Sequence, residues 1–121
     1  MKNVVIILAC SFLVGCSTVK SVMNLKEHDP ALALAYVDTK ISIQDAYCEE
    51  YETLEEAYYQ AAWMHEYTLF VNDPHKETAE GIVSDIDRAI DYSEDNIDVC
   101  NRFLKLAKIK LKTLQKTWSS R

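Results

Sequence analysis

The four cysteines, Cys10, Cys16, Cys48 and Cys100, are the residues in this chain best suited to chemistry. A metal site would need further ligands, but His65 lies 17 residues from Cys48, roughly 25 Å along a helix. The sequence contains no G-x-S-x-G, no H-E-x-x-H and no glycine-rich phosphate loop. We therefore expect no metal, no cofactor, no small-molecule substrate and no enzymatic activity, and the cysteines indicate covalent modification or a disulfide.

The N-terminal residues are typical of a secretory signal peptide. Lys2 precedes an apolar run over residues 4–14, which is too short to cross a hydrocarbon core of ~30 Å as a helix. The run ends in Leu13-Val14-Gly15-Cys16, which resembles the lipobox of bacterial lipoproteins. The resemblance implies that residues 1–15 are cleaved and that Cys16 carries the acyl chains. Cys10 follows Leu8-Ala9, a poorer match, and would leave with the signal; an ordinary secretory signal is the alternative.

The same resemblance implies a location for the mature protein in the cell. Three acyl chains give stable membrane anchoring, whereas one chain alone is marginal. In the lipoprotein family, an aspartate after the acylated cysteine favours retention in the inner membrane, and this chain has Ser17 there. We therefore expect a lipid anchor in the bacterial outer membrane, facing the periplasm, with display on the cell surface left open.

Two aspartate–proline pairs divide the mature chain. Residues 16–28 form the lipidated cysteine and a tether, and residues 29–121 form one helical domain. Asp29-Pro30 and Asp73-Pro74 each offer a side-chain acceptor for a helix N-cap and a fixed φ for the first helical position. We expect helices over about 30–71 and 74–118.

Apolar residues follow alternating spacings of four and three along the second segment, with only Ser93 polar, and a weaker version of the pattern follows the first. A repeat of 3.5 residues on two segments joined by a short turn predicts an all-α fold, a long antiparallel helical hairpin resembling a coiled coil. The alternative is a three-helix bundle, in which the second helix breaks near Ser93-Glu94-Asp95-Asn96, residues that favour caps over helix interiors.

The hairpin register pairs the two mature cysteines. Facing residues of an antiparallel pair have numbers with a constant sum, and Leu69 opposite Ala79 sets that sum at 148. Cys48 then faces Cys100, in an oxidising compartment where disulfides persist. We expect a structural Cys48–Cys100 disulfide, and two buried free thiols are the alternative.

One flank of the hairpin is apolar and would serve as an interaction face. Its main residues are Ile43, Tyr47, Leu54, Ile82, Phe103 and Leu106. Because two helices cannot cover this flank themselves, we expect a second copy, a helix of another envelope protein, or the third helix of the alternative fold to pack there. The tyrosines of the first segment also suit an interface: Tyr36, Tyr47, Tyr51, Tyr58, Tyr59 and Tyr67. For Tyr51 and Tyr58, rings packed at the edge of the seam are the alternative.

Charge is distributed unevenly. Residues 29–98 hold 18 acidic and 3 basic side chains, whereas residues 99–121 hold seven basic ones and no acid. In a hairpin the C-terminal residues lie near the lipid anchor, so we expect anionic lipid headgroups to contact the membrane-proximal basic residues Arg102, Lys105, Lys108, Lys112 and Lys116. The net charge of −6 and the envelope address disfavour nucleic acid.

These features predict an interaction protein. The first hypothesis is a structural or adaptor lipoprotein that works by self-association or by helix packing on its apolar flank. The second is an exclusion, immunity or inhibitor lipoprotein that binds another envelope protein. An adhesin-like hairpin is a third, if the chain is displayed outside the cell.

Overall fold

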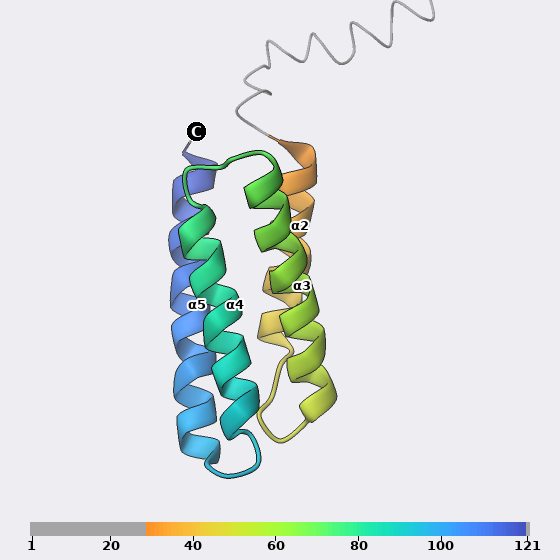
Figure 1. The fold of residues 1–121 in the computed structure, drawn as a ribbon, viewed down its shortest axis with the longest axis vertical. Helices are drawn as coiled ribbons and strands as arrows, with labels where there is room; N and C mark the ends of the chain where they lie inside the picture. The colour runs from red at the N-terminus through yellow and green to blue at the C-terminus, as the bar shows by residue number, and fades with distance from the viewer. Residues whose placement is uncertain (1–28, 121) are drawn as a thin grey trace, which may run out of the picture. The chain divides into compact units, whose positions relative to one another are not determined.

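The computed structural model describes residues 29–120, which form four α-helices (Figure 1). They are α2 (Pro30–Gln44), α3 (Tyr51–Phe70), α4 (Lys76–Tyr92) and α5 (Ile97–Ser119). The predicted all-α class is confirmed, and no β-strand occurs between residues 29 and 120. The signal peptide, Cys16 and the tether lie outside the described residues.

The two aspartate–proline pairs act differently. Helix α2 begins at Pro30, directly after Asp29, as the first pair predicts. Helix α4 begins two residues later than the second pair predicts, because the Asp73 side chain closes a turn instead: its Oδ1 accepts a hydrogen bond from the His75 N–H at 2.8 Å. Asn72, at φ 53°, adopts the left-handed conformation that asparagine tolerates well. The α3–α4 connection is therefore a tight turn fixed by side chains.

The first predicted long helix is interrupted at residues 45–50. The Thr53 hydroxyl accepts a hydrogen bond from the Tyr47 N–H at 2.9 Å and donates to the Glu50 carbonyl at 2.7 Å. These bonds satisfy backbone groups that a continuous helix would have satisfied internally. Neither glycine nor proline occurs in this interruption, so the sequence carries no helix-breaking residue there.

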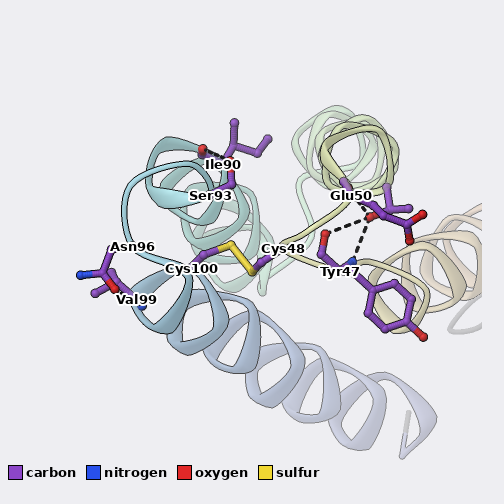
Figure 2. The surroundings of a disulfide bond; sticks show 9 residues. Tyr47, Cys48, Glu50, Ile90, Ser93, Asn96, Val99 and Cys100 are labelled. Atoms are coloured by element: carbon purple, nitrogen blue, oxygen red, sulfur yellow. Dashed lines mark hydrogen bonds between the residues drawn. A yellow bond between two sulfur atoms is a disulfide. The ribbon is translucent and has the colours of Figure 1, made fainter.

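The second predicted long helix is interrupted at residues 93–96, where the three-helix alternative placed its break. The Ser93 hydroxyl donates to the Ile90 carbonyl at 2.8 Å, and the Asn96 side chain accepts from the Val99 N–H at 3.2 Å (Figure 2). Asn96 is therefore a side-chain N-cap for α5. With both interruptions present, residues 31–120 contain four helices, where the hairpin has two and the alternative has three.

The four helices run alternately up and down (Figure 1), with α3 packed on α4 and α4 on α5. Helix α2 closes the arrangement between α3 and α5. Its Thr39 hydroxyl donates to the Gln60 carbonyl of α3 at 3.0 Å. On the other side, the Tyr36 hydroxyl donates to Gln115 Oε1 of α5 at 3.0 Å, and the Tyr36 ring stands edge-on to Trp118 with centroids 6.1 Å apart.

The end of α5 returns to the α3–α4 turn. Trp118 Nε1 donates to Asp73 Oδ1 at 3.3 Å across a separation of 45 residues. In a continuous hairpin these residues would lie about 65 Å apart, at 1.5 Å per helical residue. The single long hairpin is therefore wrong, because each of its arms folds back on itself.

The core lies inside the bundle and draws on every helix. The largest side chains that are fully buried are Ile43, Leu54, Met64, Ile82, Ile86 and Leu114. One charged pair borders the core: Lys110 Nζ lies 2.7 Å from Asp85 Oδ2, and Gly81 allows Lys110 to cross α4 closely. The whole cluster falls between Leu32 and Trp118. A chain that starts at Ser17 consequently keeps every core residue that the structure describes.

A matched pair of leucine substitutions tests this core. Leu54→Ala should lower the free energy of unfolding by about 2–5 kcal/mol, because Leu54 is 0% exposed and its loss leaves a cavity. Leu106→Ala should lower it by less than about 1 kcal/mol, because Leu106 is 42% exposed. Urea unfolding followed by circular dichroism measures both values. Equal losses would contradict the four-helix packing.

Candidate interaction surfaces

Most of the predicted apolar interaction face lies inside the bundle. Ile43, Leu54 and Ile82 are fully buried, and Phe103 is half-buried with its ring stacked on Tyr92 at 6.0 Å. Only Tyr47 and Leu106 of the expected face are exposed. Because the helices fold back, the chain covers its own apolar flank, so these six residues do not form an outer surface.

The predicted pairing of Cys48 with Cys100 is confirmed. The two sulfur atoms lie 2.08 Å apart and the Cα atoms 6.1 Å apart (Figure 2). Cys48 lies in the α2–α3 loop and Cys100 in the first turn of α5, and both are buried. The bond therefore joins the first interruption of the predicted hairpin to the helix that begins after the second. The hairpin register finds this pair although neither long helix is continuous. The reason is that α3 and α4, which lie between the two cysteines in the chain, still pack against each other as the hairpin predicts.

Acidic side chains gather at the disulfide end of the bundle. The loops and helix ends there carry Asp45, Glu49, Glu50, Glu55, Glu94, Asp95 and Asp98. The negative charge of Glu55 is the main cause that raises the pKa of Tyr51, with smaller contributions from lost hydration, a hydrogen bond to Glu55 and the charge of Glu94. This end of the bundle should repel anions.

The predicted membrane-proximal basic residues form a row along α5. All five are exposed and lie along one flank of α5, beside the buried positions Leu104 and Leu111: Arg102, Lys105, Lys108, Lys112 and Lys116. Only the last two lie toward the end of the bundle at which α2 begins (Figure 1). The basic residues therefore lie along one side of the bundle, whereas the sequence predicted that they gather at one end.

Charge is separated across the bundle as a result. Helices α2 and α5 together carry seven basic and two acidic side chains, a net charge of +5. Helices α3 and α4 together carry nine acidic and two basic side chains, a net charge of −7. Because α2 packs against α5, the two basic-rich helices form one side of the molecule.

An aromatic row, defined here as Tyr59, Trp63, Tyr67 and Phe70, lies on the outer face of α3. Trp63 and Tyr67 stack with ring centroids 5.8 Å apart, and Tyr67 lies 6.3 Å from Phe70. Tyr59, Trp63 and Phe70 are 69%, 56% and 84% exposed. With Ala62 and Glu66 the row borders an open groove of about 480 Å³. Tyr59 and Tyr67 are among the tyrosines that the sequence pointed to, whereas Trp63 and Phe70 are not. The spacing that places all four on one helix face was the available signal.

A second groove, of about 300 Å³, lies between α2 and α5. Lys40 of α2 and Lys108 and Lys112 of α5 line it, and Ile43 and Leu111 form its apolar floor. Its remaining lining residues are polar: Tyr36, Gln44 and Gln115. Burial raises the pKa of the Tyr36 hydroxyl. The sequence gives no local signal for this groove, because the groove exists only where α2 lies beside α5.

Residues 29–120 contain neither a metal-binding cluster nor a membrane-spanning helix. No group of three or more histidine, cysteine or acidic side chains in this part of the chain could hold a metal ion. None of its helices is both long and apolar enough to cross a membrane. Comparisons with protein-family models, curated proteins and solved structures found no match. The aromatic row on α3 and the groove between α2 and α5 are the surfaces that bear on function.

Removing the disulfide should weaken the fold. Replacing both Cys48 and Cys100 by serine should lower the free energy of unfolding by about 2–4 kcal/mol, because the bond closes a loop across 52 residues. Thermal or urea unfolding of the oxidised chain and the double variant gives the difference. The reduced wild-type chain is the control and should match the variant. Equal stability of all three would contradict a structural role for the bond.

Proposed function

We propose that this chain is a lipoprotein of the bacterial envelope, cleaved before Cys16 and anchored by acyl chains in the outer membrane on the periplasmic side. The lipobox-like Leu13-Val14-Gly15-Cys16 and Ser17 support this address. The mature domain binds another protein and catalyses no reaction. Its role is that of a structural or adaptor module of an envelope assembly.

The aromatic row on α3 is the observation that carries this proposal. Large rings supply much contact area at little cost in side-chain entropy, and they dominate the energetics of many protein interfaces. Exposed apolar rings that stand together on one helix face usually mark an interaction site. Trp63 lies at the middle of the row and is its best candidate for the main contact.

Charge around the row favours a foreign partner over a second copy. Glu52, Glu56 and Glu66 lie on the same outer face of α3 as the rings. Pairing two copies through this face would bring like charges together, whereas a partner with basic residues around an apolar patch would complement it. The expectation of a second copy rests on an apolar flank that the bundle buries.

An exclusion, immunity or inhibitor lipoprotein is the second candidate. The same observation supports it, because such a protein also binds a foreign envelope protein through an exposed face. The identity of the partner separates the two candidates: a component of the cell's own envelope assembly indicates an adaptor, and an incoming or antagonistic protein indicates the second class.

Acylation should depend on Cys16 alone. In the producing bacterium, Cys16→Ser should abolish both cleavage before residue 16 and incorporation of labelled palmitate, whereas Cys10→Ser should leave both unchanged. Intact mass spectrometry of membrane extracts detects the acylated N-terminus. Normal palmitate incorporation in the Cys16→Ser variant would overturn the proposed anchor.

The aromatic row should contact a partner in the intact envelope. A photo-cross-linking phenylalanine analogue at Trp63 should give one discrete adduct, and the same analogue at Tyr47, an equally exposed position in the α2–α3 loop, should give none. Trp63→Ala should weaken binding to the purified partner by at least about 2 kcal/mol while leaving the unfolding midpoint nearly unchanged.

Light scattering on the chain from Ser17 onward supplies the control for oligomeric state. We expect a monomer under oxidising and reducing conditions. A dimer that Trp63→Ala converts to a monomer would contradict a foreign partner and assign the aromatic row to self-association.

A further inference from the structure

The groove between α2 and α5 concentrates positive charge in an acidic protein. Lys40, Lys108 and Lys112 border it, in a chain whose formal net charge is −6. Like charges placed close together repel one another, and a bound anion removes that repulsion. The groove therefore has the charge of a site for an anion.

No acid of the described chain neutralises these lysines. Within residues 29–120 none of the three takes part in an ion pair; the neighbouring Lys110 pairs with Asp85 on the α4 side. Helix α5 contains no acidic residue after Asp98. On α2, Asp38 lies about 200° around the helix from Lys40, since successive residues turn by roughly 100°. The ammonium groups of these three lysines are therefore available to an anionic ligand.

The groove is also amphipathic. Its floor is formed by Ile43 and Leu111, while Gln44 and Gln115 add amide groups near the lysines. The Tyr36 hydroxyl already donates to Gln115 Oε1, so the amide nitrogen of Gln115 keeps its two hydrogens for another acceptor. Such a lining suits a ligand that combines a phosphate group with an apolar part.

The surface beyond the groove matches a membrane better than a small ligand. The basic row of α5 continues on either side of it through Arg102, Lys105 and Lys116. The apolar side chains of Leu106 and Ile109, which are 42% and 51% exposed, lie among these basic residues. Basic residues interspersed with apolar ones on one helix face are typical of helices that lie on anionic membranes.

We propose that the α2–α5 groove binds the phosphate of an anionic phospholipid headgroup, with Lys40, Lys108 and Lys112 as the contacting residues. The inference uses the proposed function only in requiring that the envelope membrane lies within reach of the chain. The α2–α5 side then rests on the lipid surface. Helix α3 lies across the bundle from α5 (Figure 1), and its aromatic row, on the outer face of α3, stays available to a protein.

Vesicle sedimentation of the chain from Ser17 onward tests this site without an acyl anchor. The wild-type chain should bind phosphatidylglycerol vesicles and not phosphatidylcholine vesicles, with an affinity that falls as salt rises. The triple variant K40Q/K108Q/K112Q removes the groove lysines. The matched variant R102Q/K105Q/K116Q removes the same charge from α5 outside the groove.

The groove variant should lose at least tenfold more affinity than the matched variant, with both circular dichroism spectra unchanged. Equal losses would overturn the site, because they would show attraction by net charge alone. Equal binding to phosphatidylcholine would overturn the requirement for an anionic headgroup. If glycerol 3-phosphate, titrated against the chain by NMR, competes fully with vesicles, a free phosphate compound is the ligand and the lipid assignment fails. Acylation of Cys16 is measured separately, so loss of the anchor and loss of the groove site are distinguishable.

Discussion

Apolar side chains occupy more than one face of the helical segments, and the need to remove all of them from water determines the fold. A two-helix hairpin buries only the seam between its arms, which would leave Ile43, Leu54 and Ile82 in solvent. Folding each arm back on itself brings these residues into one core, where they are fully buried. The bonds of Thr53 to Tyr47 and Glu50 and the Asn96 cap allow the chain to reverse without exposing unsatisfied backbone groups.

How far sequence reasoning reached can be traced to particular residues. Asp29-Pro30 marked the start of α2 and the register paired Cys48 with Cys100, because both signals are local or survive the folding back of the arms. Ser93 and Asn96 marked the second interruption, since both are residue types that favour caps. The first interruption has no glycine or proline, and its determinant, the Thr53 hydroxyl, is recognisable only once the loop has formed. Because the sequence does not reveal the first interruption, it cannot predict the contact between α2 and α5 or the groove that this contact forms.

The same folding back redistributes charge. In a hairpin the basic residues of α5 would gather at one end, whereas in the bundle they lie beside α2 and opposite the acid-rich α3 and α4. Two dissimilar surfaces result: the lysine-lined groove on one side and the aromatic row with its acidic neighbours on another. Under the two proposals made above, this separation would let one small domain meet an anionic surface and a protein partner at the same time. The two surfaces share no residue, because the groove belongs to α2 and α5 and the aromatic row to α3.

The position of the disulfide has a mechanical consequence. Cys48 follows α2 and Cys100 begins α5, so α3 and α4 lie within a covalently closed loop. Tension applied between the two ends of the chain passes along α2, through the sulfur–sulfur bond and along α5, and bypasses the loop. A protein that is tethered at its N-terminus and pulled through its C-terminal helix would thus keep α3 unloaded. The helix with the aromatic row could hold its shape while α2 and α5 bear the force.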